Sequence, residues 1–239
     1  MKKKKRSVFR VVINSFLCLL FVIGAALIFM NPIKDYLIKQ TGESYAVDAI
    51  DRSEIEKNKN VETTFDFDAV EPVSVEAILK AQFSHKALPV IGGIAIPSVG
   101  INLPIFKGLS NEALLYGAGT VSPTQKMGED NYALASHRTE NLALLFTPLD
   151  QVELGAMIYL TDLENVYVYT ATSSVRVDPT AVYLLDEVEN RKIITLITCG
   201  EIGGVTRRVV QGDLVSVTPI DKATNEMLEA FGMEQQTLG

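Results

Sequence analysis

The sequence predicts a mainly β domain, either a closed barrel or a sandwich, behind one N-terminal transmembrane helix. Two observations lead to this prediction. An uncharged apolar block occupies residues 11–30, and from about residue 90 onward short β-rich segments alternate with Gly, Pro and Asn. A chain of 239 residues has room for one such domain with appendages, but hardly for two large domains.

The apolar block reads VVINSFLCLLFVIGAALIFM. As a helix, twenty residues span about 30 Å, which matches the hydrocarbon core of a bilayer. Six cations and no acidic residue precede it in residues 1–10, and this bias predicts that the N-terminal segment is cytoplasmic. The alternative is a cleaved signal peptide, whose apolar core would be shorter and would end at a small-residue cleavage site. We therefore expect a single-pass anchor in the cell membrane, with the rest of the chain extracellular.

The exported part is acidic and contains one cysteine. It keeps 16 of the 22 basic residues against all 29 acidic residues, so we expect no nucleic-acid partner. Cys18 lies in the predicted anchor and Cys199 in the exported part, so no structural disulfide is expected. An exported, unpaired thiol is either a buried small hydrophobe or a reactive group.

The elements after the anchor follow from composition and periodicity. Residues 31–75 are polar and acidic and are interpreted as an extracellular stalk or linker, residues 76–220 as the folded domain, and residues 221–239 as a C-terminal tail. Candidate strands are residues 93–96, 101–106, 131–135, 157–161, 166–171, 173–177, 192–199, 207–210 and 214–219. Short helical patterns, expected at the periphery, occur at residues 75–83, 111–115, 143–149 and 223–231.

Three residue types that together can perform acyl transfer stand near strand ends. Cys199 ends a β-branched segment, and a Gly-containing loop leads from it to a strand that begins near Arg207. Strand alternation places Arg207 and Arg208 on opposite faces, so only one of them points toward the cysteine. His137 follows another strand, although a lone histidine is more often structural than catalytic. A thiolate, a proton donor for the leaving amine and a cation for the oxyanion are what acyl transfer from an amide requires.

The motifs TLITC at residues 195–199, an arginine eight residues later, and LASH at residues 134–137 resemble those of the sortases. The likeness extends from about residue 87 to 217 and includes GGIAIPSVGINLPIFKG, YGAGT and TRRVVQGDLV. This resemblance implies a closed barrel of about eight strands with a few short peripheral helices. It also implies a class A, housekeeping-type enzyme, a membrane-anchored cysteine transpeptidase, with residues 76–220 as the catalytic domain.

The resemblance also implies roles for the three residues. Cys199 would attack the Thr-Gly bond of an LPXTG-type sorting signal, His137 would protonate the leaving amine, and Arg207 would stabilise the oxyanion or position the substrate. An amine of a cell-wall precursor of the lipid II type would then release the surface protein from the enzyme. Arg207 is preferred to Arg208 because Gly212, which opens the following G-D-L turn, lies five residues after it, as in the family.

Substrate recognition in the family uses the loop before the cysteine strand, here about residues 176–191. Candidate contacts are Val177, Pro179, Thr180 and Ala181 in this loop, with Ser136 and Thr198 beside the catalytic pair. Each has a structural alternative, since a proline, for example, can simply shape a turn. No cofactor and no metal site is predicted. Calcium stimulation stays open, because scattered carboxylates are more often solvated surface than ligands.

Three alternatives remain. Papain-like proteases have their cysteine before the histidine and on a helix, whereas His137 precedes a strand-borne Cys199 here. L,D-transpeptidases carry a Ser-x-Gly-Cys sequence, which is absent around Cys199. A noncatalytic wall or adhesion module would keep this thiol buried and unreactive toward labelling reagents.

Overall fold

The computed structural model describes residues 2–84 and 87–233, with side chains from residue 8 onward. Residues 85–86, and residues 234–239 of the predicted tail, lie outside this description. The chain divides into two compact units, Met1–Leu37 and Ile38–Gly239. The first is formed by the N-terminal part of α1 (Lys2–Ser44), and the second holds every strand.

Helix α1 has the length and composition of a membrane-spanning segment. The candidate span is Val8–Ser44, with a mean hydropathy of 2.7 in its most apolar window. None of that window is buried in the protein, and Phe21 and Ile28 are among its exposed side chains. A helix satisfies its own backbone hydrogen bonds, so such a segment can face lipid. This helix is consistent with the predicted membrane anchor.

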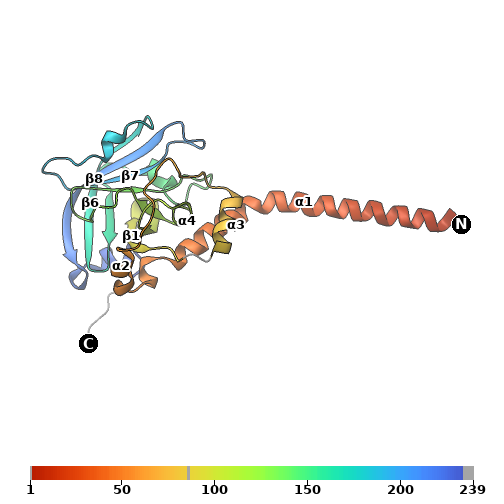
Figure 1. Ribbon diagram of the computed structural model, residues 1–239, viewed down its shortest axis with the longest axis horizontal. Coiled ribbons are helices and arrows are strands. Elements are labelled where there is room, and N and C mark those ends of the chain that lie inside the picture. Colours follow the sequence, from red (N-terminus) through yellow and green to blue (C-terminus); the bar gives the residue numbers. More distant parts are fainter. Residues whose placement is uncertain (1, 85–86, 234–239) are drawn as a thin grey trace. The chain divides into compact units, whose positions relative to one another are not determined.

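Eight strands in the second unit close into a barrel (Figure 1), which confirms the predicted mainly β fold class. Around the barrel the order is β1-β2-β3-β4-β7-β8-β6-β5, and β5 closes it by pairing with β1. The strands are β1 (Val90–Ile96), β2 (Ile101–Phe106), β3 (Ala118–Thr120), β4 (Asn131–Ala135), β5 (Met157–Thr161), β6 (Asn165–Val177), β7 (Ile193–Cys199) and β8 (Arg207–Pro219).

The pairings around β7 determine which loops meet at one end of the barrel. Strand β4 runs parallel to β7, so the chain leaves both strands at the same end. Strand β8 is antiparallel to both β7 and β6, so it begins at the end where those two finish. The segments after β4, β6 and β7 and the segment before β8 therefore converge there.

The barrel interior is filled by large apolar side chains. Ile94, Leu134, Leu196 and Val210 are among the buried members of this core. Full burial of such a side chain contributes about 1.5–3 kcal/mol to folding. At the end where β4, β6 and β7 finish, the 3-10 helix η3 (Thr147–Gln151) lies close to the inward side chains of β8, as the contacts of Arg208 described below show.

The strand predictions were close but differed in three places. Segment 118–120 was not predicted because three residues, Ala-Gly-Thr, carry no periodicity. Strands β6 and β8 were each expected as two pieces. Their pairing continues through register shifts between Val168 and Tyr169 and between Ala171 and Ser173, where bulges interrupt the alternation.

The predicted helix at residues 143–149 was wrong. The segment forms turns and leads into η3, and Leu145 has a φ of 52°. That left-handed conformation is incompatible with a right-handed helix, although the apolar spacing resembles one. The short helices that do form include α3 (Val75–Ser84), α4 (Asn111–Leu114), α5 (Asn225–Glu229), η2 (Pro97–Val99), η4 (Val182–Leu185) and η5 (Ile220–Lys222).

Residues on both sides of the predicted domain 76–220 pack on the barrel. The predicted stalk contains η1 (Val47–Ala49) and α2 (Arg52–Asn58), in which Val47 and Ile55 are buried. They join a second apolar cluster with Leu228 and Phe231 from the predicted tail. The boundaries of the five predicted regions stay predictions, but the apolar packing of the second unit extends across both 75 and 220.

Candidate active site

The thiol of Cys199 lies at the last residue of β7, opposite the first residue of β8. Its cross-strand partner is Arg207, and Thr198 pairs with Arg208. Because Leu196 and Val210 point into the barrel core, alternation puts Thr198 and Arg208 on the inward face. Cys199 and Arg207 therefore occupy the outward face, where the sulfur is partly exposed and unpaired.

The histidine comes to this face through the parallel pairing of β4 with β7. Ala135 pairs with Ile197, and the Ser136 amide continues the ladder with a hydrogen bond of 3.2 Å to the Ile197 carbonyl. Continuing the same register puts His137 beside Cys199. A further backbone bond, from the Phe146 amide to the His137 carbonyl at 3.2 Å, holds the segment after the strand.

The imidazole of His137 is buried and electrically neutral at neutral pH. It is 8% exposed, and its Nε2 atom has no hydrogen-bond partner among the residues that the structure describes. Burial disfavours the charged form and lowers the pKa of His137 from 6.5 to about 4. A neutral imidazole with a free ring nitrogen can accept a proton before it donates one.

The guanidinium of Arg207 faces the same small space as the sulfur. Its Nη1 atom donates to the carbonyl of Gly204 at 2.7 Å and to that of Thr206 at 3.2 Å. A Cβ atom added at Gly204 would lie 3.3 Å from this nitrogen and 3.5 Å from the Cys199 sulfur. Glycine at this position, with a φ of 70°, leaves open the space between them.

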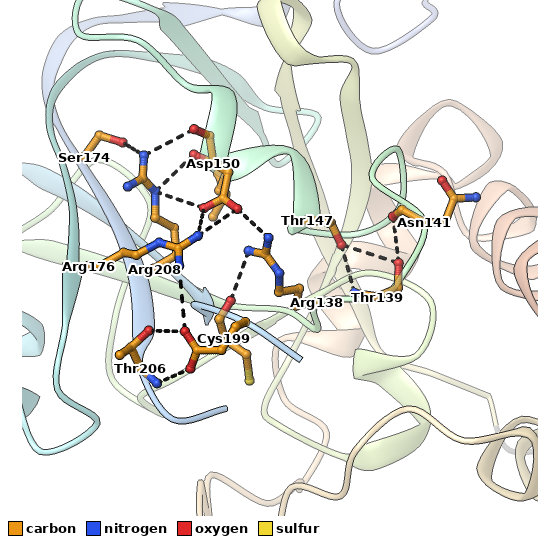
Figure 2. Close-up of polar contacts among 12 residues, drawn as sticks. Arg138, Thr139, Asn141, Thr147, Asp150, Ser174, Arg176, Cys199, Thr206 and Arg208 are labelled. Carbon is orange, nitrogen blue, oxygen red and sulfur yellow. Dashed lines mark hydrogen bonds and ion pairs between the residues drawn. The ribbon is translucent and has the colours of Figure 1, made fainter. Parts of the chain in front are cut away.

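The neighbouring Arg208 points away from this space (Figure 2). It donates to the carbonyls of Leu149 and Asp150 at 3.4 Å and to the Ser174 hydroxyl at 2.6 Å. These partners belong to η3 and β6 and lie on the inward side. The geometry therefore supports Arg207 as the arginine of the site, and its catalytic role remains a prediction.

Comparison with known proteins identifies the relatives of this chain. The sortase domain family matches residues 94–215, just over half of the chain. Sortase A of Streptococcus agalactiae serotype III (strain NEM316) is 41% identical over 235 residues, covering 96% of this chain and 95% of that protein. The chain belongs to the sortase family. The prediction of a sortase is therefore confirmed.

Other relatives agree with this assignment. Sortase A of Listeria monocytogenes serovar 1/2a (strain ATCC BAA-679 / EGD-e) is 38% identical, covering 85% of this chain and 92% of that protein. The crystal structure of Listeria monocytogenes sortase A, 40% identical, aligns with a TM-score of 0.56 over 61% of this chain and 99% of that one. This sortase is a cysteine transpeptidase, and its similarity to sortase A proteins confirms the class A assignment.

Three of the predicted substrate contacts of this sortase lie beside the site. Val177 pairs with Arg207 across β6 and β8. Thr198 is buried, and its hydroxyl has no hydrogen-bond partner within residues 2–84 and 87–233. The Ser136 hydroxyl donates to the Gly117 carbonyl at 2.7 Å, so this side chain also ties β4 to the segment before β3. All three remain predicted substrate contacts.

The other three predicted contacts lie in the loop between β6 and β7. Asp178 shapes the turn there, because its carboxylate accepts bonds from the Thr180 amide at 2.9 Å and hydroxyl at 2.6 Å. Its carbonyl accepts from the Ala181 amide at 3.0 Å. Pro179 lies within this turn, so the geometry gives these residues a local structural role beside the predicted recognition role.

The sequence interpretation overlooked exposed apolar side chains in the two loops that follow β6 and β7. Val182 and Tyr183, in η4, are 66% and 65% exposed. Ile202 and Val205, between β7 and β8, are 61% and 74% exposed. Apolar residues in loops otherwise rich in Asp, Glu and Gly were the available signal, and it is a weak one because single exposed apolar residues are common on protein surfaces.

The sequence interpretation also overlooked a cluster of ionic side chains at the end of the barrel where β4, β6 and β7 finish (Figure 2). We call it the Asp150 cluster. The carboxylate of Asp150 contacts Arg138, Arg176 and Arg208. Partial burial acts to raise the pKa of Asp150, but the hydrogen bond and charge of Arg138, with those of Arg176, outweigh it and keep this pKa below its usual value. Asp150 is therefore ionised at neutral pH.

Metal binding has little support in the described part of the chain. No group of three or more His, Cys, Asp or Glu side chains there is placed to hold an ion. Glu201, two residues after Cys199, accepts from the Thr206 amide at 2.5 Å and hydroxyl at 2.6 Å. These bonds lower the pKa of Glu201, first through the side chain and then through the backbone of Thr206. The prediction of no metal site stays a prediction.

Proposed function

We propose that this sortase attaches surface proteins to the cell wall by cleaving an LPXTG-type sorting signal between Thr and Gly. The acceptor is an amine of a cell-wall precursor of the lipid II type. The observation that carries the proposal is the shared space between the Cys199 sulfur and the Arg207 guanidinium, which lies on the outward face beside a buried, neutral His137.

In the first half of the reaction, the sulfur of Cys199 attacks the carbonyl carbon of the substrate threonine. The thiol proton passes to Nε2 of His137, which has no competing partner among the described residues. Arg207 is placed to stabilise the negative charge that develops on the carbonyl oxygen. The imidazolium then donates its proton to the glycine nitrogen as the carbon–nitrogen bond breaks, which leaves a thioester on Cys199.

In the second half, an amine of the wall precursor attacks the thioester carbonyl. His137 accepts a proton from this amine as the new amide bond forms, and the proton then returns to the departing sulfur. The low pKa of His137 favours both proton releases and makes the preceding proton acceptances unfavourable, because burial destabilises the imidazolium. The histidine therefore serves as acceptor and donor in each half.

The location of the enzyme follows from α1 and the charges before it. We infer that the basic residues 1–10 remain cytoplasmic and that the second unit lies outside the cell, near membrane-bound substrates. An anchor of this kind raises the effective concentration of substrates that share the membrane. Accessibility of the second unit to protease added outside intact cells tests this orientation.

Mass spectrometry of the full-length enzyme in detergent, incubated with an LPXTG peptide and an amine, tests the proposed reaction. We expect cleavage between Thr and Gly, capture of the amine and a transient adduct at Cys199. Cys199→Ala is the control and should form none of these products. Peptide cleavage by the Cys199→Ala variant would refute the thioester mechanism. Absence of cleavage by the folded, unaltered enzyme would refute the LPXTG specificity.

A further inference from the structure

The Asp150 cluster lies immediately behind the proposed catalytic residues, yet the proposed reaction makes no use of it. Arg176 and Arg208 are a cross-strand pair of β6 and β8, and Arg208 also pairs with Thr198, the residue before the thiol. Alternation along β7 and β8 therefore separates the outward face of the catalytic residues from the inward face of this cluster. The two groups of side chains share the same short piece of backbone.

Arg138 connects the two groups. It directly follows His137, and its guanidinium pairs through Nη2 with Asp150. Through Nη1 it donates to the backbone carbonyl of Cys199 at 3.4 Å, as Figure 2 shows. The backbone ladder between the two segments continues as far as the bond from Ser136 to Ile197. After that bond, the next connection is the Arg138 side chain. It joins the segment that follows β4 to the backbone of Cys199.

The position of Asp150 is itself held by the barrel. Arg208, whose side chain is 14% exposed, binds the backbone carbonyls of Leu149 and Asp150 as well as the carboxylate. Without the carboxylate, Arg138 would meet two other guanidinium groups and no anion from η3, and the like charges would push it away. Asp150 therefore decides where the Arg138 guanidinium sits.

We propose that Arg138 and Asp150 are positioning residues of the transpeptidation. Asp150 holds the Arg138 guanidinium against the Cys199 carbonyl and so maintains the distance between the imidazole of His137 and the sulfur. The inference rests on the proposed roles of Cys199 and His137. Those roles could hold without it, because neither Arg138 nor Asp150 contacts the reacting atoms in the proposed mechanism.

The test compares Arg138→Gln and Asp150→Asn with the unaltered full-length enzyme. Both variants should lower kcat by about tenfold or more, since a displacement of about 1 Å in a catalytic arrangement can cost up to ~100-fold. KM should change by less than about threefold, because the substrate loop between β6 and β7 has its own anchors, described below. Asp150→Glu keeps the charge and should recover part of the kcat that Asp150→Asn loses.

A purely electrostatic effect on the thiol makes a different prediction. Asp150→Asn adds one unit of positive charge to a region that already contains Arg138, Arg176, Arg207, Arg208 and Glu201, whereas Arg138→Gln removes one unit. Changes of kcat in opposite directions would therefore overturn the positioning role. Losses in both variants support it.

The matched control is Asp213→Asn, which removes the partner of Arg191 at the other end of the β7–β8 pair. This variant should keep kcat within about twofold, because a surface ion pair contributes little. Thermal unfolding of each variant shows whether it is folded at the assay temperature. If Asp150→Asn does not fold, Arg138→Gln decides the question, since it leaves Asp150 paired with Arg176 and Arg208.

Three results would contradict the inference while leaving the proposed function intact. They are an unchanged kcat in folded Arg138→Gln, a rise in KM alone, and a loss no larger than that of the Asp213 control. Failure of the proposed function would look different, because the unaltered enzyme would then not cleave the peptide or Cys199→Ala would still cleave it.

Discussion

At the scale of single residues, the distinctive feature of the site is that two buried polar atoms have no hydrogen-bond partner among the described residues. His137 has no described partner for Nε2, and Thr198 has none for its hydroxyl. Buried polar atoms are usually paired, so unpaired ones beside the Cys199 thiol are consistent with the proposed roles of this site in substrate binding and proton transfer. Two predictions belong to this scale.

The first concerns the pH dependence of stability. The folded-state pKa of His137, about 4, lies below its unfolded value of 6.5, so the unfolded chain binds a proton first as the pH falls. The stability present above pH 6.5 is lost progressively between pH 6.5 and about 4, by about 3 kcal/mol in total. Urea unfolding of the unaltered enzyme and of His137→Gln at several pH values measures this contribution to the free energy of unfolding. If the two free energies of unfolding changed with pH in parallel, the predicted contribution of His137 would be contradicted.

The second separates the two adjacent arginines. Arg207→Ala should lower kcat/KM by about 100-fold or more, because it removes the cation that we propose stabilises the oxyanion, with little change in unfolding temperature. Arg208→Ala should instead destabilise the fold by about 1–3 kcal/mol, because it removes a donor to the carbonyls of Leu149 and Asp150 and one of the cations that pair with the Asp150 carboxylate. Peptide cleavage and thermal unfolding of both variants decide between them. A greater loss of activity in folded Arg208→Ala would assign the catalytic role to Arg208.

At the scale of elements, the loop between β6 and β7 is tied to the barrel through the carbonyl oxygens of Leu184 and Asp186. The Leu184 carbonyl accepts from Asn131 at 2.9 Å, from Gln211 at 3.2 Å and from Thr195 at 3.4 Å. These donors come from β4, β8 and β7. Asn131 donates in addition to the carbonyl of Asp186 at 3.0 Å. Three strands therefore hold the loop that we expect to bind the sorting signal.

Removing the most extensive of these donors should weaken substrate binding. Asn131→Ala should raise KM several-fold with a smaller change in kcat, because a loosened loop loses conformational entropy when it becomes ordered around the substrate. Steady-state kinetics with an LPXTG peptide measures the effect, and faster hydrogen exchange of residues 178–190 would show the loosened loop. A change in kcat alone would argue that the loop does not bind the peptide.

At the scale of the whole molecule, the apolar packing of the second unit includes both flanks of the predicted domain. Ile55 from the predicted stalk is fully buried, and Phe231 from the predicted tail is 1% exposed. Both pack in the cluster on the outer surface of the barrel that includes Ala95 and Val168 of β1 and β6. This surface would be exposed to water in a chain cut at the predicted boundaries.

Substitutions in this cluster test how far the folded unit extends. Phe231→Ala should destabilise the protein by about 3–5 kcal/mol and Ile55→Ala by about 2–5 kcal/mol, through the lost contacts and the remaining cavity. Chemical unfolding measures both. The exposed Leu154, in the turn before β5, provides the control, since Leu154→Ala should change stability by less than about 0.5 kcal/mol. Equal, small effects at all three positions would place the boundaries where the sequence predicted them.

The sequence by itself determined the fold class, the long apolar N-terminal helix and the identity of the catalytic candidates. Strand alternation, a long uncharged apolar run and short motifs around Cys199 and His137 are local features, so a single segment is enough to read them. The placement of Arg207 and Arg208 on opposite faces of the sheet also follows from alternation within one strand. What only the tertiary structure decided depends on partners that are distant along the chain. The three-residue strand β3, the left-handed turn at Leu145 and the meeting of Arg138, Asp150 and Arg208 all arise because barrel closure brings together segments whose own sequences do not encode those contacts.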